Sequence, residues 1–549
     1  MSAILSLHNP TRAQTYYRAL WWRDDTLYAL LRENAQTRPD RPALQDSARR
    51  LSWVDLYRWV EAIAIDLHAA GLRPGDRVSV WLPNRIETVA TTLACSRNGY
   101  ICNPSLHQSY TVAEVAAALE RIGSAALIAQ PGFGADADKA DIFDHLPRLP
   151  SIRRAIRVPP VADAGAEARA ALQLRKGPLP SAQSDPDKIV LLAFTSGTTG
   201  EPKGVMHSDN TLLANARAMA ADWRHDETIV LFSMSPLTHA IGTIAMAQAL
   251  VSGFELVLND VPKGESALDR IAAAGATYVM GVPTHAVDIL DEARRRGMDR
   301  LGNVKVFYMG GAAIARETVR SLLDMRITPQ NVYGMTENGA HQYTLPDDDA
   351  ETIASTCGRA CAGYEVRIFD QDNTDVELPC GAIGEIGGRG ACLMLGYFGD
   401  QAASEQSFNR GGWFMTGDLG TLDAHGRLSI VGRKKDIIIR GGRNIHPARM
   451  EDLARSHPAV LKASAFPVAD TRLGEKVCIA VVVRPQMTLG AEELLSHLAA
   501  SGLSKYDLPE YFVALDQLPL TPSGKILKRS LVEQVAAGAI RPLPVRNQT

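Results

Sequence analysis

The chain has 549 residues, of which 46% are hydrophobic and 22% are charged, so we expect several domain-sized units around a large buried core. The formal net charge of -3 argues against a nucleic-acid partner. Seven cysteines over this length are too few for a disulfide scaffold, and we expect reduced thiols and a cytoplasmic location.

Helical and strand-like patterns alternate through the first 310 residues. From apolar residues at helical spacing, we expect helices at 53–70, 86–97, 112–122, 212–223, 268–274 and 285–296. Strands are expected at 77–82, 100–102, 125–129, 189–194, 228–233, 254–258, 278–282 and 304–309. Asp209 or Asn210 is the expected N-cap of the helix at 212–223. This alternation predicts mostly parallel sheets covered by helices, an α/β fold.

The pattern changes near residue 354, where strands become short and glycine becomes frequent. Strands at 365–369, 384–388 and 428–431 predict a β-rich subdomain. A helix at 448–457 and strands at 463–468 and 478–483 then predict a small α+β domain. The longest apolar stretch, 244–258, is interrupted by polar residues and is shorter than the ~18 residues that a membrane-spanning helix needs. We therefore expect no membrane span.

The run from Thr195 to Gly204 predicts a phosphate-binding loop. It follows the apolar strand at 189–194 and contains three glycines, four hydroxyl side chains and one lysine, Lys203. Glycines let backbone amides approach an anion, hydroxyls add donors, and the lysine adds a positive charge. The run differs from the P-loop of NTPases, because Lys203 precedes Gly204 instead of following a glycine. The alternative is a flexible surface turn.

Four further clusters contain residues that could bind a ligand or take part in catalysis, although each alone is compatible with an ordinary surface segment. An aromatic, a hydroxyl and a carboxylate in 333–337 could stack on a base, bind a phosphate oxygen and hold Mg²⁺. Asp418, in a glycine-flanked turn, could accept hydrogen bonds from ribose hydroxyls. The basic run 432–447 is typical of a linker that becomes a strand and loop. Lys525 follows a Pro/Ser/Gly turn that would present it on a mobile loop.

In their order, spacing and residue identities, these five motifs resemble those of the adenylate-forming enzyme superfamily. This superfamily contains acyl- and aryl-CoA synthetases, peptide-synthetase adenylation domains and beetle luciferases. The resemblance covers the chain from about Leu27 to Lys528. It implies that a carboxylate attacks the α-phosphate of ATP, giving an acyl-adenylate and pyrophosphate, and that a thiol then displaces AMP. It also implies ATP, Mg²⁺ and coenzyme A as ligands.

The resemblance assigns the nucleotide site residue by residue. The β- and γ-phosphates are assigned to Thr195, Ser196, Gly197, Thr198, Thr199, Gly200 and Lys203. The adenine, α-phosphate and metal are assigned to Gly310, Gly311, Ala312, Tyr333, Gly334, Met335, Thr336 and Glu337, with Tyr333 on the adenine, Thr336 on the α-phosphate and Glu337 on Mg²⁺. Asp418 and Arg433 would bind the ribose, and Lys525 would bridge the carboxylate and the α-phosphate.

The resemblance also implies a two-part chain with a hinge. A large N-terminal domain is expected at 1–431, a hinge at 432–436 and a small mobile C-terminal domain at 437–549. Lys435 is the expected hinge residue and Asp436 the second candidate. Rotation there would present either Lys525 for adenylation or the Gly441-Gly442 loop at the thiol tunnel.

The acyl pocket is expected around His239, the residue that gates the carboxylate in acyl- and aryl-CoA ligases. Amino-acid-activating domains tend to carry an aspartate in this region instead. The expected walls are small or apolar, which favours an uncharged hydrophobic acyl group: Ile241, Gly281, Val282, Pro283, Gly311 and Met335. Two departures from the usual pattern, Ser208-Asp209 and His341-Gln342, could reshape this pocket.

The residues of these motifs resemble most those of acid:CoA ligases of the cyclohexanecarboxylate-CoA ligase type. We therefore expect an acid:CoA ligase for an alicyclic or medium-chain acid. An aryl-CoA ligase, or an enzyme that loads a carrier protein, is the alternative within the class. A non-catalytic nucleotide-binding relative is the alternative from another class, and it would be expected to lack Lys525, Glu337 or Lys203. The sequence leaves a homodimer open.

Overall fold

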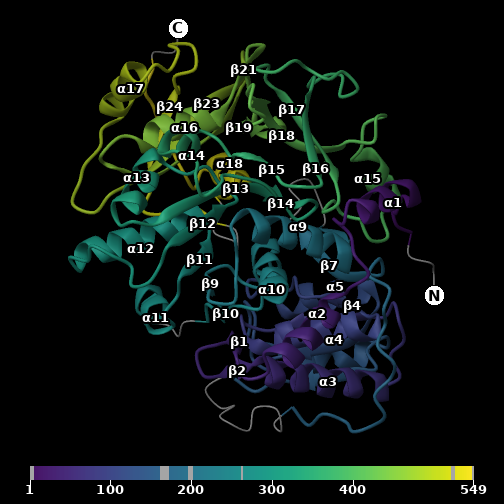
Figure 1. Ribbon diagram of the computed structural model, residues 1–549. Coiled ribbons are helices and arrows are strands. Elements are labelled where there is room, and N and C mark those ends of the chain that lie inside the picture. The colour runs from purple at the N-terminus through teal and green to yellow at the C-terminus, as the bar shows by residue number, and fades with distance from the viewer. Residues whose placement is uncertain (1–4, 161–171, 196–201, 261–263, 521–525, 547–549) are drawn as a thin grey trace.

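Figure 1 shows the protein as a computed structural model, which describes residues 5–160, 172–195, 202–260, 264–520 and 526–546. These residues form four β-sheets. Two large sheets, both mainly parallel and accompanied by helices, take up the first two thirds of the chain, and an antiparallel sheet and a C-terminal sheet follow. The predicted α/β fold, with a large N-terminal part and a smaller C-terminal domain, is confirmed.

The largest sheet has the strand order β15-β14-β13-β12-β11-β9-β10-β1-β2. Its strands are β1 (Pro42–Gln45), β2 (Arg50–Ser52), β9 (Val230–Ser233), β10 (Glu255–Leu258), β11 (Tyr278–Gly281), β12 (Val306–Gly310), β13 (Thr328–Met335), β14 (Gly339–Tyr343) and β15 (Arg359–Ala360). The middle of the sheet is parallel and consists, in spatial order, of β13, β12, β11, β9, β10 and β1. The segments 234–239, 281–283 and 310–312 therefore emerge at one edge, the carboxyl edge where α/β sheets bind ligands.

The second large sheet has the order β6-β5-β3-β4-β7-β8. Its strands are β3 (Arg77–Trp81), β4 (Ile101–Asn103), β5 (Ser124–Ala129), β6 (Arg154–Arg157), β7 (Ile189–Thr195) and β8 (Lys203–Ser208). All neighbours are parallel except β7 and β8, which form an antiparallel pair. Every residue of β5 is buried, as expected for an apolar strand in a parallel sheet that is covered on both faces.

Helices cover these sheets and fill the space between them. They are α1 (Pro10–Arg18), α2 (Leu27–Thr37), α3 (Trp53–Ala69), α4 (Ile86–Asn98), α5 (Val112–Ile122), α6 (Ile142–His145), η1 (Leu146–Arg148), α9 (Asp209–Asp222), α10 (Ala240–Ser252), α11 (Ala267–Ala273), α12 (Pro283–Arg295), α13 (Arg316–Asp324) and α14 (Ala350–Ser355). Every residue of α4 is buried, and α2 and α3 pack beside it (Figure 1). Within the described ranges, none of the helices has the length and apolar character needed to cross a membrane.

The start of α9 corrects one expectation. Its N-cap is Ser208, and not Asp209 or Asn210. The Ser208 Oγ accepts the backbone N–H of Thr211 at 3.2 Å, and the Thr211 Oγ1 accepts the backbone N–H of Ser208 at 3.0 Å, which is a reciprocal capping box. Asp209 is instead buried, with its carboxylate 2.5 Å from Lys188 Nζ.

The remaining sheets lie in the last third of the chain. The four-stranded antiparallel sheet consists of β16 (Tyr364–Phe369), β17 (Gly384–Gly390), β18 (Phe414–Leu422) and β19 (Leu428–Arg433), with α15 (Gln401–Gln406) before β18. The short helix η2 (Lys434–Asp436) follows β19. The C-terminal domain contains β20 (Ile438–Arg440), β21 (Arg443–Ile445), α16 (Pro447–Arg455), β22 (Val460–Asp470), β23 (Gly474–Val483), α17 (Ala491–Ala500), β24 (Tyr511–Ala514), α18 (Lys528–Ala536) and β25 (Leu543–Pro544). Both the β-rich subdomain and the α+β domain are thus present.

The expected turn around Asp418 was wrong. Asp418 lies inside β18, where it is the antiparallel partner of Arg433 at the end of β19. Gly417 has a φ of +73° and the pairing is irregular after Leu419. A strand that bends at glycines contains the same residues as a turn, which is why its composition was misleading.

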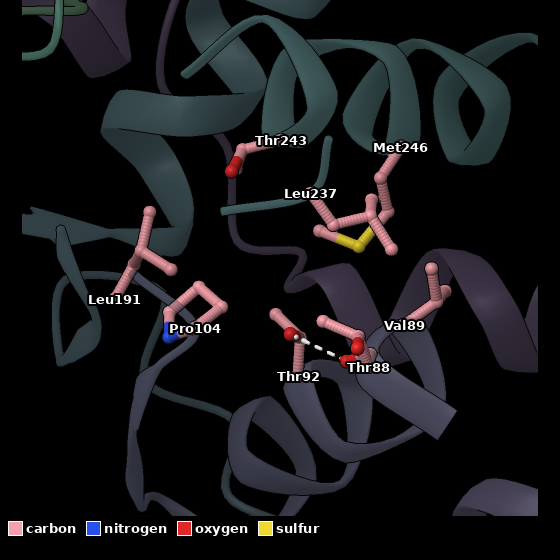
Figure 2. A pocket seen from close by; sticks show the side chains of 8 residues that line it. All are labelled: Thr88, Val89, Thr92, Pro104, Leu191, Leu237, Thr243 and Met246. Carbon is pink, nitrogen blue, oxygen red and sulfur yellow. Dashed lines mark hydrogen bonds between the residues drawn. The ribbon is translucent and has the colours of Figure 1, made fainter. Parts of the chain in front are cut away.

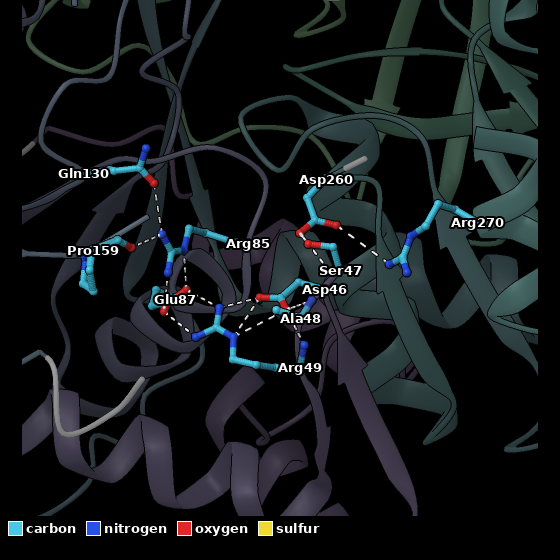
Figure 3. A network of polar contacts seen from close by, with 10 residues as sticks. All are labelled: Asp46, Ser47, Ala48, Arg49, Arg85, Glu87, Gln130, Pro159, Asp260 and Arg270. Atoms are coloured by element: carbon cyan, nitrogen blue, oxygen red, sulfur yellow. Dashed lines mark hydrogen bonds and ion pairs between the residues drawn. The ribbon is translucent and has the colours of Figure 1, made fainter. Parts of the chain in front are cut away.

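A buried network of charges joins the two large sheets (Figure 3). Arg49, next to β2 of the largest sheet, lies 2.7 Å from Glu87 in α4. Arg85, which is completely buried, also binds Glu87 at 2.7 Å and donates to the carbonyl oxygen of Pro159 at 2.7 Å. Asp46 pairs with Arg49 from the other side. Two arginines and two carboxylates therefore neutralise one another where the sheets meet, as buried charges require.

Candidate active site

The two arms of the predicted phosphate loop are the antiparallel strands β7 and β8. Thr195 ends β7 and is the pairing partner of Lys203, the first residue of β8. The loop residues between them that were assigned to phosphate, Ser196, Gly197, Thr198, Thr199 and Gly200, lie outside the described residues, as does Lys525. The assignments of these six residues stay predictions.

Glu337 and Lys203 meet on opposite parts of a third residue, Tyr397. The Tyr397 hydroxyl lies 3.0 Å from Glu337 Oε1, and the Lys203 Nζ lies 4.8 Å from the centre of the Tyr397 ring. Burial raises the pKa of the Glu337 carboxyl, whereas the hydrogen bond from Tyr397 and the positive charge of Lys203 act in the opposite direction. The structure therefore brings the predicted metal ligand and the predicted phosphate lysine together.

The predicted adenine and ribose residues form a second group. The Tyr333 hydroxyl donates to Asp418 Oδ2 at 2.9 Å, and Arg433 Nε lies 3.0 Å from Asp418 Oδ1. A carboxylate has about four lone-pair directions, so Asp418 keeps the capacity to accept from a ligand. Arg433 also acts electrostatically on Glu337, which links this group to the first one.

Thr336 is held in place through its backbone. Its carbonyl oxygen lies 2.7 Å from His207 Nε2, and the ring nitrogen must be the donor in this contact. Burial lowers the pKa of His207 to about 4, so the ring is neutral at physiological pH. His207 belongs to β8, and the contact therefore connects the phosphate arm to the Thr336-Glu337 pair.

The end of β12 runs beside the end of β13. Gly310 is the pairing partner of Val332, the residue before Tyr333, so Gly310, Gly311 and Ala312 emerge next to the predicted adenine residue. Gly311 has a φ of +87°, a backbone conformation that favours glycine. This placement is consistent with a backbone wall beside a base.

Gly334 leaves no room for a side chain. A Cβ built on it would lie 1.8 Å from the carbonyl oxygen of Gly339 in the neighbouring strand. We expect Gly334→Ala to displace β14 and to lower the free energy of unfolding by about 1–3 kcal/mol, with weaker ATP binding, as measured by urea denaturation and calorimetry. The control is Gly490→Ala, where a Cβ has open space. Equal stability of the two variants would contradict the prediction.

The predicted acyl-pocket residues come from the same carboxyl edge of the largest sheet. His239 is the N-cap of α10, and Ile241 is in the first turn of that helix. Gly281 ends β11, Val282 is the N-cap of α12, and Pro283 is the first residue of that helix. The Val282 N–H lies 3.3 Å from the Nδ1 of His285, a ring whose pKa burial lowers to about 4. Met335 packs against the apolar cluster around Tyr397.

His107 is a neighbour of His239 that the sequence did not indicate. The two rings are stacked, with centroids 4.5 Å apart, and His107 Nδ1 lies 3.1 Å from Thr238 Oγ1. Burial lowers the pKa of His107 to about 4, which keeps this ring neutral. The wall beside His239 is therefore uncharged and aromatic.

A small cavity lies between α4 and α10 (Figure 2). It holds about 10 Å³ of free volume, roughly the space of one water molecule. The cavity is lined by Thr88, Val89, Thr92, Pro104, Leu191, Leu237, Thr243 and Met246. Among the described residues, none of those predicted for the acyl pocket belongs to this lining. A cavity of this volume is too small for an acyl chain.

The basic run contains the transition between the two parts of the chain. Lys434, Lys435 and Asp436 form the short helix η2. Lys434 Nζ is 2.9 Å from Glu385 Oε2 in β17. The chain is therefore attached to the antiparallel sheet at the residue immediately before Lys435, the predicted hinge residue. Gly441 and Gly442 form the two-residue turn between β20 and β21, both with positive φ. Among the described residues, a Cβ on either glycine would meet only Leu473 of the same domain.

Tyr397 and His207 are the other site residues that motif reasoning missed. Tyr397 follows Gly396 outside the named strands and forms an isolated antiparallel bridge with Val205 of β8. His207 follows the apolar residues of β8. A single tyrosine or histidine in such a context has no distinguishing spacing, so only the folded chain reveals these contacts.

Comparison with known proteins now identifies the family. The AMP-binding enzyme family matches residues 31–398, and the AMP-binding enzyme C-terminal domain matches residues 449–525. A medium-chain fatty-acid–CoA ligase of Escherichia coli strain K12 is 30% identical over 525 residues, which cover 95% of this chain and 92% of that protein.

A second relative comes from Mycobacterium tuberculosis and is a 3-[(3aS,4S,7aS)-7a-methyl-1,5-dioxo-octahydro-1H-inden-4-yl]propanoyl:CoA ligase. It is 32% identical over 522 residues, which cover 92% of this chain and 98% of the relative. The solved o-succinylbenzoate CoA synthetase of Bacillus subtilis, in complex with its acyl-adenylate intermediate, superposes with a TM-score of 0.77 at 27% identity, covering 91% of this chain and 97% of the other. The resemblance inferred from the five motifs is confirmed, and so is the class of AMP-forming acid–thiol ligases. The chain belongs to the AMP-binding enzyme family.

Proposed function

We propose that the chain is an ATP-dependent carboxylic acid:CoA ligase that acts on an alicyclic or medium-chain acid. The observation that supports this proposal most is the convergence of four separate segments on one place. Lys203 from β8, Glu337 after β13, Asp418 from β18 and Arg433 at the end of β19 are linked through Tyr397, Tyr333 and their mutual charges. These are the residue types that a nucleotide triphosphate and its metal need.

In the first step, a carboxylate oxygen of the acid attacks the α-phosphorus of ATP, and the bond from that phosphorus to pyrophosphate breaks. Lys203 neutralises charge on the outer phosphates, and Tyr333 and Asp418 orient the adenosine. Glu337 is an oxygen ligand in a half-buried site, which fits a hard cation. Mg²⁺ held there would supply further charge neutralisation. Positioning and electrostatics therefore account for most of the catalysis.

In the second step, the thiol sulfur of coenzyme A attacks the acyl carbon, the bond to the AMP oxygen breaks, and the thiol proton is released. AMP is a far better leaving group than the oxygen that a free carboxylate would have to lose, and this is the reason for adenylating the acid first. Lys525 is expected to serve the first step and the Gly441-Gly442 turn the second.

The choice of acid rests on the uncharged wall of the acyl pocket. Ile241, Val282 and Pro283 are apolar, and the stacked His107 is neutral. The relatives that are named for medium-chain fatty acids and for a bicyclic propanoate support an acid with an apolar body.

Pyrophosphate release with ATP, Mg²⁺ and a panel of acids, with and without coenzyme A, tests the proposal. We expect faster turnover with octanoate and cyclohexanecarboxylate than with benzoate, and acyl-CoA formation only when coenzyme A is present. A preference for benzoate would favour the aryl-CoA alternative. AMP formation that is indifferent to coenzyme A would favour an enzyme that loads a carrier protein, and no turnover with any acid would favour a non-catalytic relative.

We also propose the domain limits expected from the sequence, 1–431, 432–436 and 437–549, with rotation at Lys435. The support is local: the chain is anchored on the antiparallel sheet through Lys434 and Arg433, and the C-terminal sheet begins at Ile438. The cytoplasmic location and the homodimer stay predictions.

The hinge proposal predicts that Lys435→Pro separates the two half-reactions. Proline fixes φ near −65° and restricts the residue before it, so one pose of the C-terminal domain is disfavoured. We expect acyl-adenylate formation and thioester formation from supplied acyl-adenylate to be affected unequally, differing by about tenfold or more, a free-energy difference of ~1.4 kcal/mol. The control is Lys435→Ala, which removes the side chain and leaves the backbone free. A larger separation in Asp436→Pro would move the hinge to Asp436, and equal losses in both half-reactions would contradict rotation here.

A further inference from the structure

A short segment of the chain lies between the phosphate arm and Glu337. On one side, the Phe398 N–H donates to the carbonyl oxygen of Gly204 at 2.7 Å, next to Lys203. On the other side, the Met394 N–H donates to the carbonyl oxygen of Glu337, also at 2.7 Å. The backbone of this segment therefore connects β8 to the turn between β13 and β14 that contains Glu337.

Tyr397 projects from this segment and contacts both charged side chains. Its hydroxyl donates to Glu337 Oε1 at 3.0 Å, and its ring faces Lys203 Nζ at 4.8 Å. Its backbone N–H donates to Ser404 Oγ at 2.8 Å, and only 6% of the residue is exposed. The ring is consequently fixed by its surroundings and does not depend on a ligand for its position.

Tyr397 lies between the opposite charges of Lys203 and Glu337. Lys203 and Glu337 both contact the side chain of Tyr397, yet the described residues contain no ion pair between them within 4.0 Å. A direct ion pair would have to break before phosphates and a cation could bind. A tyrosine instead provides a hydroxyl donor for the carboxylate and an electron-rich ring face for the ammonium group.

We propose that Tyr397 is a positioning residue that holds Lys203 and Glu337 apart and ready for a triphosphate and its metal ion. This inference rests on the proposed role of those two residues in ATP binding. Tyr397 acts through its neighbours: its hydroxyl orients one oxygen of Glu337, and its ring orients the ammonium group of Lys203.

Two substitutions separate the functions of the ring and the hydroxyl. Tyr397→Phe keeps the ring under Lys203 and removes the donor to Glu337. We expect KM for ATP to change little and the Mg²⁺ concentration for half-maximal activity to rise about tenfold. Tyr397→Leu removes both contacts, so KM for ATP should also rise.

The matched control is Tyr343→Phe. Tyr343 also donates to a carboxylate, Asp222 Oδ2 at 2.7 Å, but it lies outside the proposed site, so kinetics should stay those of the wild type. Melting temperatures of all variants identify any effect of misfolding. An unchanged Mg²⁺ requirement in Tyr397→Phe would overturn the inference, as would the same change in Tyr343→Phe.

Binding experiments distinguish this inference from the proposed function. Calorimetry with ATP, in Mg²⁺ or in EDTA, needs no turnover. A protein that binds ATP better with Mg²⁺ but converts no acid would contradict the ligase function, and a loss of that Mg²⁺ dependence in Tyr397→Phe would still support the role of Tyr397. A Mg²⁺ dependence equal to that of the wild type would overturn it.

Discussion

Glu337→Gln is expected to lower the kcat/KM for acyl-adenylate formation by about 100- to 1,000-fold, the range for losing one preorganised electrostatic group at a reacting centre. The substitution keeps the size of the side chain and an acceptor for the Tyr397 hydroxyl, 3.0 Å away. It removes the negative charge that would hold Mg²⁺. The loss should therefore appear mainly in kcat and in the Mg²⁺ requirement, and the protein should stay folded.

The pH profile supplies a second measurement on the same variant. Burial raises the pKa of Glu337 above its ordinary value, and the charged form is the one needed for the cation. Wild-type activity should therefore fall as pH decreases through that raised pKa, and Glu337→Gln should lack this limb.

Glu255→Gln is the control for Glu337→Gln, because Glu255 is also buried and paired, with Arg50 at 2.6 Å, but is remote from the site. Near-normal turnover by Glu337→Gln at saturating Mg²⁺ would remove Glu337 from the proposed metal site.

Glu87→Gln is expected to destabilise the N-terminal part by about 3–5 kcal/mol, the usual consequence of leaving a buried charge without its partner. Glu87 is 1% exposed and binds both Arg49 and Arg85, each at 2.7 Å. Glutamine cannot neutralise two guanidinium groups. Urea denaturation, followed by the tryptophan fluorescence of this part, measures the difference.

The effect should depend on pH in a defined direction. Burial alone would raise the pKa of Glu87, but hydrogen bonds from Arg49 and the charge of Arg85 lower it below the usual value. The stabilisation is therefore present above the ordinary pKa of glutamate and is lost as pH falls through the lowered folded-state pKa. The difference between wild type and Glu87→Gln should shrink in acid.

An exposed glutamate–arginine pair provides the control. Glu365 lies 3.3 Å from Arg389 on the antiparallel sheet, and its side chain is 54% exposed. Exposed pairs contribute about 1 kcal/mol or less, so Glu365→Gln should be nearly neutral. Equal destabilisation by the two substitutions would mean that the network around Glu87 does not depend on its burial.

Much of the fold follows from local patterns. The predicted helix at 53–70 is α3, Trp53–Ala69, and the predicted strand at 189–194 is β7, Ile189–Thr195. Apolar periodicity reports which face of an element is buried, and that requirement is the same wherever the element packs. The exceptions are elements with many glycines or polar residues: β18 resembled a turn, and β13 and β14, which flank Glu337, were not predicted.

The sequence by itself determined the class of chemistry, because its five motifs, in this order, resemble those of the adenylate-forming enzymes. Only the tertiary structure decided which of these residues meet. Asp418 and Arg433 pair because β18 and β19 are antiparallel neighbours in a particular register. Tyr397 joins Lys203 to Glu337 because its segment is hydrogen-bonded both to β8 and to the turn between β13 and β14. Such contacts depend on distances through space between residues far apart in the chain, and local spacing contains no information about them.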